Sequence, residues 1–306
     1  MSKSIPQSDP CAKLNKRALL IINPVSGRRF VNRSAAKIIR RLMDEGYLVT
    51  TTITGAQGDA TAFTRDLGVF DLVVCAGGDG TLHETVVGLL QSGNSVPVGY
   101  IPCGSTNDFA ITHGLPVLIP EAIERAAVGS VRRFDVGRFG DTHFLNTAAF
   151  GAFSWMAYTT DQTRKNMLGL TAYVLDAAKE LPHLKPRFMR IEIDGKVYED
   201  DYLVGAICNG TSVLGIVELP EGYADTCDGM LEVFLIRFPR SLPELESIVR
   251  SLVFSTFSSP MITLAQGRSI TVSCDEPCIW SLDGESSGEI SRAEISTVPG
   301  FLQMKI

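Results

Sequence analysis

Short apolar runs alternate with amphipathic stretches through the first third of the chain, and this alternation limits the fold more than any other feature. The apolar runs have the length and β-branched content of buried strands, and the amphipathic stretches carry apolar residues at helical spacing. Expected strands are Ala18 to Asn23, Tyr47 to Ile53, Asp71 to Ala76 and Pro97 to Ile101; expected helices are Val31 to Glu45, Gly58 to Leu67 and Thr81 to Leu90. Strands alternating with helices predict an α/β domain: a parallel sheet with helices on both faces.

The pattern changes near Val131, where short strands begin to follow one another with turn residues between them. Asp194 and Gly195 lie between two alternating runs and predict a hairpin turn. Two helical stretches interrupt the strands, Asp161 to Leu181 and Leu242 to Phe257. The sequence therefore predicts two domains, 17–130 and 131–306, of which the second is an antiparallel β domain. The last strand is a candidate to return to the first domain.

Composition narrows the functional classes. The net charge of the 306 residues is −6, which argues against a general nucleic-acid-binding protein. No apolar run has the length of a membrane-spanning helix, and the first residues lack the apolar stretch of a signal peptide. The seven cysteines are scattered, which leads us to expect a reducing, cytoplasmic setting. Cys274 and Cys278 are compatible with a metal site or a disulfide, but two buried thiols are the favoured interpretation.

The most concentrated signal is the segment from Gly77 to Thr81, GGDGT, between an expected strand and an expected helix. Glycines let the backbone approach a ligand closely, and a helix N-terminus attracts anions. Asp79 would repel a phosphate, so its presence makes sense if it holds Mg²⁺ or water. A simple strand-to-helix turn with a capping residue is the alternative.

Three more polar loops follow neighbouring strands. They are Asn23 to Gly27, the loop containing Thr54 and Gly58, and Gly104 to Phe109. In a parallel sheet the loops after the strands lie at one edge, where ligands bind. No P-loop and no complete dinucleotide-binding fingerprint is present, so the site belongs to neither class.

The motifs NPVSG, GGDGTLHE and GSTNDFA, in this order and spacing, resemble the soluble diacylglycerol kinase and sphingosine kinase family of lipid kinases. The resemblance continues at DTCDGM and LDGE and covers nearly the whole chain from Arg17. It implies an α/β nucleotide domain, a β-sandwich second domain and ATP-dependent phosphorylation of a lipid hydroxyl with Mg²⁺. Diacylglycerol or a related lipid alcohol is the expected substrate.

The resemblance also implies roles for individual residues. Asp79 would serve the catalytic metal, and Ser105 stands where the family usually has threonine, which keeps a hydroxyl. The implied metal site consists of Asp225, Asp228 and the Met230 carbonyl. The implied nucleotide-binding residues are Asn23, Pro24, Thr54, Gly58, Gly77, Gly78, Asp79, Gly80, Thr81, Leu82, His83, Gly104, Ser105, Thr106 and Asn107.

The family's catalytic base lies in the DGE triplet, here Asp283 to Glu285. Phosphoryl transfer to an alcohol needs a proton acceptor close to the hydroxyl, and a carboxylate serves. Two carboxylates two residues apart on a strand would face the same side. We expect Glu285 to be the base, with Asp283 close behind. Taken alone, LDGES would be interpreted as a hairpin turn.

Two other functions remain open at this point: a kinase of a soluble substrate such as NAD, and a non-catalytic nucleotide-binding regulator. The expected partners are the lipid substrate, a membrane surface contacted peripherally and reversibly, and a second copy in a homodimer; nucleic acid is not expected. The expected membrane contact is the basic stretch with Arg164, Lys165, Lys179, Lys185 and Arg187.

Overall fold

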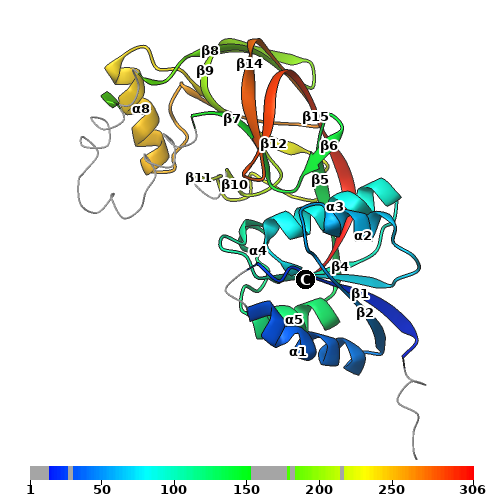
Figure 1. The fold of residues 1–306 in the computed structure, drawn as a ribbon. Coiled ribbons are helices and arrows are strands. Elements are labelled where there is room, and N and C mark those ends of the chain that lie inside the picture. The colour runs from blue at the N-terminus through cyan, green and yellow to red at the C-terminus, as the bar shows by residue number, and fades with distance from the viewer. Residues whose placement is uncertain (1–13, 27–29, 153–177, 180–182, 214–216) are drawn as a thin grey trace, which may run out of the picture. The chain divides into compact units, whose positions relative to one another are not determined.

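The computed structural model describes residues 14–26, 30–152, 178–179, 183–213 and 217–306. The chain divides into two compact units, and the division falls between Phe134 and Asp135. The first unit also includes Phe301–Ile306, and the second is Asp135–Gly300. Figure 1 shows the helices and strands of each unit.

The first unit is an α/β domain, as the alternation of strands and helices predicts. Its sheet has the order β15-β4-β3-β1-β2, with all neighbours parallel. Figure 1 shows α1 and α5 on one side of these strands and α2 and α3 on the other. Its strands are β1 Lys16–Ile22, β2 Tyr47–Ile53, β3 Leu72–Gly77, β4 Val98–Pro102 and the end of β15, Glu285–Lys305; its helices are α1 Phe30–Asp44, α2 Asp59–Arg65, α3 Asp79–Ser92, α4 Asp108–Thr112 and α5 Ile119–Val128.

The core of the first unit explains why its strands are continuously apolar. All six residues of β3 are buried, because helices cover both faces of the sheet. On one face, Ile38 and Leu42 of α1 pack with alanines of α5 against β1, β3 and β4. Gly46 ends the α1 segment with a φ of 84°, as a glycine after a helix does.

Two short helices in this unit were not predicted. Helix α4 begins directly after Asn107, which lies in the left-handed region with φ 55°, and the segment was interpreted as a loop. Helix α5 has buried Ala122, Ile123 and Ala126 at helical spacing and a proline in its first turn. That pattern could have been found in the sequence.

The second unit is β-rich and antiparallel, in agreement with the prediction. Its main path is β13-β12-β9-β7-β14-β15, with β8 paired to both β14 and β9, and β5 paired to β15 and β6. Its elements are β5 Val131–Phe139, β6 Thr142–Phe144, β7 Thr147–Gly151, β8 Arg187–Ile193, β9 Lys196–Cys208, β10 Ser212–Val213, β11 Val217–Glu218, β12 Leu231–Arg237, α8 Leu242–Val253, β13 Ile262–Gly267, β14 Ser269–Leu282 and β15.

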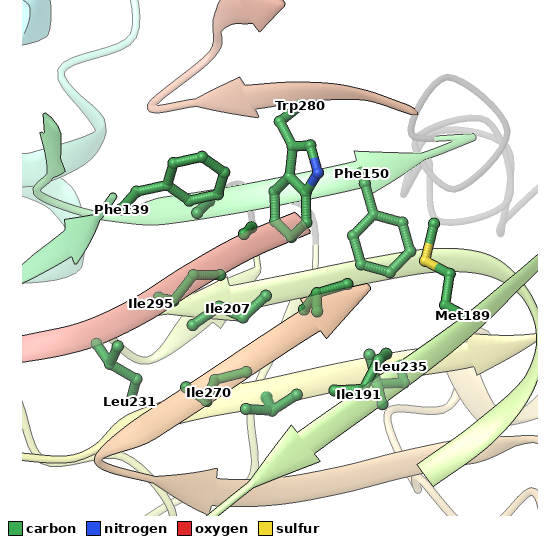
Figure 2. Close-up of a cluster of buried hydrophobic side chains, with 14 of the residues drawn as sticks. Phe139, Phe150, Met189, Ile191, Ile207, Leu231, Leu235, Ile270, Trp280 and Ile295 are labelled. Carbon is green, nitrogen blue, oxygen red and sulfur yellow. The ribbon is translucent and has the colours of Figure 1, made fainter. Parts of the chain in front are cut away.

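Two apolar clusters lie on opposite faces of this sheet. Strand β12 serves both: Val233 and Leu235 join one cluster, and Phe234 joins the other with α8. The first of these clusters contains Trp280, whose ring lies 4.9 Å from those of Phe139 and Phe150 (Figure 2). Burial on both faces accounts for the four consecutive apolar residues of β12, Val233 to Ile236.

Of the two helices predicted in the second unit, one ends earlier than expected and the other lies mostly outside the described residues. Helix α8 ends at Val253, four residues before the expected end at Phe257. Ser255 and Phe257 both have a φ of 49°, and the left-handed backbone stops the helix. Most of the expected helix 161–181 lies outside the described residues, including Arg164 and Lys165.

Candidate functional site

Four loops meet at the carboxyl edge of the parallel sheet in the first unit, as the sequence predicts. Asn23 follows β1, Thr54 follows β2, Gly78 follows β3 and Cys103 follows β4. The Thr54 N–H donates to the Ile22 carbonyl at 2.9 Å, and the Asn23 N–H donates to the Ala76 carbonyl at 3.0 Å. The loops therefore leave the sheet already fixed by backbone hydrogen bonds.

Glycines allow two of these loops to touch. A Cβ on Gly104 would lie 2.9 Å from the Gly78 Cα, and a Cβ on Gly78 would lie 3.2 Å from the Gly104 Cα. Gly77 has no room for a side chain either, because an added Cβ would lie 2.6 Å from the Thr81 side chain. A side chain at Gly77 or Gly104 would force neighbouring atoms to shift, and one at Gly78 would press against the Gly104 backbone.

Asp79 connects the loop before α3 to the loop before α4. One carboxylate oxygen accepts from the Thr106 hydroxyl at 3.2 Å and from the Asp108 N–H at 3.1 Å. The other accepts from the Phe109 N–H at 3.1 Å. The side chain thus supplies α4 with the N-terminal hydrogen bonds that Asn107, its N-cap, does not provide. With three acceptor positions occupied, the geometry supports a positioning role for Asp79 more than direct ligation of a metal.

Asn23 and Ser26 attach the first loop to the same segment. The Asn23 amide donates to the Thr81 hydroxyl at 2.9 Å, and the Gly78 N–H donates to the Ser26 hydroxyl at 3.2 Å. Helix α3 begins at Asp79, and its N-cap Gly78 has no side chain with which to cap it. A helix N-terminus behind a glycine loop suits a phosphate group.

The remaining nucleotide-site residues that the sequence indicated lie in or beside these loops. Ser105 and Thr106 are exposed, Leu82 is buried in α3, and His83 is half-buried in its first turn. Gly58 has a φ of 90°, and its N–H donates to a carboxylate oxygen of Glu84 at 2.8 Å. Sequence analysis missed Glu84, which also accepts from the Ala60 N–H at 3.2 Å and so ties the second loop to α3.

In the second unit, the Asp283 and Gly284 pair forms the two-residue turn of the β14–β15 hairpin, with Leu282 paired to Glu285. Both turn residues have positive φ, 49° and 88°, as a type I′ turn requires. The expectation that Asp283 and Glu285 share one face of a strand was therefore wrong, because Asp283 is in the turn. The hairpin interpretation of LDGES holds for the backbone.

The two carboxylates of this hairpin have different surroundings. Asp283 is half-buried and accepts three backbone N–H groups, from Leu145 at 2.7 Å, Asn146 at 2.8 Å and Thr147 at 2.9 Å. Glu285 is exposed, and within the described residues its carboxylate has no hydrogen-bond partner. Asp283 is thus fixed by the loop before β7, whereas Glu285 keeps its acceptor positions available.

The predicted metal-binding loop is an exposed acidic turn. Asp225 accepts the Cys227 N–H at 3.1 Å, and Asp228 accepts the Met230 N–H at 2.8 Å. Sequence analysis missed Asp135, which is buried and accepts the Gly229 N–H at 2.7 Å. Its burial, together with the charges of Asp228 and Asp225, raises the pKa of Asp135. An acidic residue between the apolar residues Phe134 and Val136, which are both buried, was the available signal.

Other predicted features have mixed outcomes. Cys278 is buried, but Cys274 is only half-buried, so the expectation of two buried thiols holds for one of them. Across the described ranges, no three His, Cys, Asp or Glu side chains form a group that could hold a metal ion. None of the helices described has the length and apolar character needed to cross a membrane.

Comparison with known proteins gives consistent matches along the chain. Residues 17–139 match the diacylglycerol kinase catalytic domain, and residues 147–306 match the YegS C-terminal NAD kinase beta sandwich-like domain. A diacylglycerol kinase of Bacillus subtilis (strain 168) is 31% identical over 277 residues, covering 89% of this chain and 91% of that protein. One from Staphylococcus saprophyticus is 30% identical over 281 residues, covering 90% and 91%.

A solved structure has the same fold. A proposed diacylglycerol kinase from Bacillus anthracis str. Sterne superimposes with a TM-score of 0.74 at 26% identity and covers 95% of this chain and 98% of that one. The catalytic domain that matches the first unit implies the use of ATP. The glycine loops at the sheet edge, the β-rich second unit and these matches agree, and the chain belongs to the bacterial diacylglycerol kinase family.

Proposed function

We propose that this protein is an ATP-dependent lipid kinase that transfers the γ-phosphate of ATP to the hydroxyl of diacylglycerol or a related lipid alcohol. The observation that carries the proposal is the joined pair of glycine loops in the first unit, fixed by Asp79 at the start of α3. Such a site suits the phosphates of a nucleotide. The family match and the diacylglycerol kinase relatives support the choice of substrate class.

In this proposal the first unit binds and orients ATP. Backbone N–H groups at the start of α3 hold phosphate oxygens, and the exposed hydroxyl of Ser105 is a further donor. Asp79 keeps the two loops in register through its three hydrogen bonds. Phosphoryl transfer depends mainly on alignment and charge stabilisation, so rigid loops contribute directly to the rate.

Glu285 is the proposed general base, and Asp283 positions the hairpin that carries it. A base needs acceptor positions that are not already occupied, which favours Glu285 over Asp283. Asp283 with its three N–H donors fixes the turn against the loop before β7. The proton of the lipid hydroxyl would pass to a carboxylate oxygen of Glu285 as the phosphate is transferred.

Mg²⁺ is the implied cofactor, and the acidic loop of the second unit is its proposed site. Asp225 and Asp228 are exposed oxygen ligands of the kind that Mg²⁺ prefers, and buried Asp135 adds negative charge beside them. These two carboxylates and the Met230 carbonyl would hold a largely hydrated ion. When bound there, the ion would neutralise the mutual repulsion of the acidic groups.

The substrate resides in a membrane, so the proposal includes peripheral contact with a lipid surface. Within the described residues, Lys185 is exposed and Arg187 is half-buried at the start of β8. Lys179 is exposed as well, and exposed lysines of this kind are suited to an anionic lipid surface. A second copy of the chain remains a proposed partner.

The test is phosphorylation of a substrate panel by the full-length protein with Mg²⁺ and labelled ATP. The panel contains diacylglycerol, a sphingoid base, phosphatidylglycerol and NAD. We expect a labelled lipid; robust turnover of NAD with none of any lipid would refute the proposal and favour the soluble-substrate alternative. ATP binding without turnover of any substrate would favour the non-catalytic regulator.

A pair of variants tests the base. Glu285→Gln keeps size but cannot accept a proton, so kcat should fall by about 10²- to 10⁴-fold with ATP binding unchanged. Asp283→Asn should lower the thermal midpoint, because an amide cannot accept all three N–H groups, and should cost less in kcat. If Asp283→Asn lowered kcat more than Glu285→Gln did, the two roles would be reversed.

A further inference from the structure

Strand β14 contains a wide bulge between its two cysteines. In the pairing with β15, Ser273 lies opposite Arg292, and the next paired residue, Cys278, lies opposite Ile290. The chain thus advances five residues along β14 while it covers two along β15. The extra residues bring Cys274 and Cys278 back toward each other. Bulges bend a strand locally and leave residues outside the ladder, so the backbone here has room to adjust.

The two thiols are in contact. The Cys274 Sγ lies 3.9 Å from the Cys278 Sγ and 3.4 Å from each of the carbonyl oxygens of Ile290 and Ser291. Both are free cysteines. Once one of two sulfurs held this close has been oxidised, the other reacts with it at high effective concentration, because little further ordering is needed.

The surroundings give the two sulfurs different roles. Cys274 is half-buried and reachable from solvent, whereas Cys278 is buried and lines a cavity of about 340 Å³ with Phe150, Tyr202 and Arg187. Burial, followed by the neighbouring Cys274, raises the pKa of Cys278 to about 12. The Arg187 guanidinium donates to the Pro277 carbonyl at 3.0 Å and places a positive charge at the bulge. Cys274 is therefore the first sulfur to react, and Cys278 the second.

We propose that Cys274 and Cys278 form a reversible peroxide-oxidised dithiol site, closing to an intramolecular disulfide across the bulge. The Cys274 thiolate attacks one oxygen of hydrogen peroxide; the O–O bond breaks, giving a sulfenic acid and hydroxide, which takes up the proton that the thiol released. The Cys278 sulfur then attacks the sulfenic sulfur, an S–S bond forms and water leaves. Two thiols and one peroxide give one disulfide and two waters.

The sequence permits a clean measurement of this disulfide. Trypsin cleaves after Arg268 and Arg292, and the peptide between them contains Cys274, Cys278 and no other cysteine. Native, reduced protein is titrated with hydrogen peroxide, alkylated with iodoacetamide, digested and weighed. We expect the peptide to become lighter by two hydrogens, to resist alkylation at both cysteines, and to revert with dithiothreitol. Exposed Cys227, on a different tryptic peptide, is the internal comparison.

Half of the Cys274–Cys278 pair should be converted to the disulfide at a peroxide dose about tenfold lower than the dose that protects Cys227 from alkylation. The reason is that the Cys278 thiol traps the sulfenic acid formed at Cys274. If both cysteines stayed fully alkylated at doses that consume Cys227, the proposal would be wrong. Separate sulfinic acids on the two residues would overturn it as well.

Serine variants assign the order of the two steps. In Cys278→Ser the first product has no partner, so dimedone should label Cys274; in Cys274→Ser neither the disulfide nor a dimedone adduct should form at that dose. Cys227→Ser is the matched control and should leave the disulfide unchanged. Absence of dimedone label in Cys278→Ser, in a protein whose circular dichroism matches wild type, would refute the order and with it the mechanism.

Discussion

His113 should make the first unit sensitive to acid. Its ring packs against those of Phe109 and Phe134, with centroids 4.2 Å and 4.8 Å away, and its buried Nε2 atom has no hydrogen-bond partner among the residues described. Burial, with a smaller effect from Arg132, lowers the pKa of His113 to about 3 from its ordinary 6.5. The folded unit therefore holds this imidazole neutral where the unfolded chain would protonate it.

The sign and size of the effect follow from this difference. Because the folded pKa is depressed, stability is fully present above pH 6.5 and is lost as the pH falls below it. For one such group, the free energy of unfolding should decrease by about 2 kcal/mol between about pH 7.5 and about pH 5. His113→Phe should abolish this pH-dependent decrease in the free energy of unfolding. It should also remove the buried nitrogen without a partner, which destabilises the folded state by about 1–3 kcal/mol.

Two measurements check this. Urea unfolding at several pH values gives the free energy for wild type, for His113→Phe and for His183→Phe, in which an exposed histidine is the control. The chain has four histidines, so NMR resolves their ring protons, and the signal that disappears in His113→Phe should not titrate down to about pH 5. A His113 signal that titrates near 6.5 would refute the reasoning.

The other predictions concern the loops and the second unit. Gly104→Ala should weaken ATP binding and destabilise the protein by about 1–3 kcal/mol, because its Cβ would meet the Gly78 backbone; calorimetry and thermal melts measure both, and Gly68→Ala, with open space around it, should change neither. Asp79→Asn keeps the size of the side chain but loses acceptor capacity for three donors, so kcat should fall together with the thermal midpoint; a normal rate would contradict its positioning role. Burial raises the pKa of Glu232 to about 7. Ionising this carboxylate in the folded protein is therefore unfavourable, and its contribution should lower the free energy of unfolding as the pH rises from about 4.5 to about 7. Urea unfolding at several pH values should show this decrease in wild type and its absence in Glu232→Gln.

The pattern of apolar residues was enough to predict the fold, because burial on both faces of a parallel sheet gives strands such as β3 no polar positions. It also predicted which loops share an edge. It could not predict helix α4, because five residues carry too little periodicity and the helix depends on Asp79, nearly thirty positions earlier.

Roles within the site were harder to predict than positions. A carboxylate in a glycine loop suggests a metal ligand, and only the structure reveals the three donors around Asp79. The metal role of Asp79 stays a prediction. The sequence was compatible with Asp283 in a strand or in a turn. The role of its carboxylate depends on the backbone N–H groups of residues 145–147, which are far away in the chain. Such long-range hydrogen bonds leave no trace in local sequence.

The last strand returns to the first unit, which has a consequence for the order of events on the ribosome. Leu302 and Met304 are buried, and the Lys305 ammonium donates to the Gly129 carbonyl at 2.9 Å. A nascent chain that has exposed only residues up to 134 therefore lacks one strand of its first sheet, and β4 has an unpaired edge. While the second unit is being translated, this edge is open to pairing with other chains, and the first unit is complete only when β15 has left the exit tunnel.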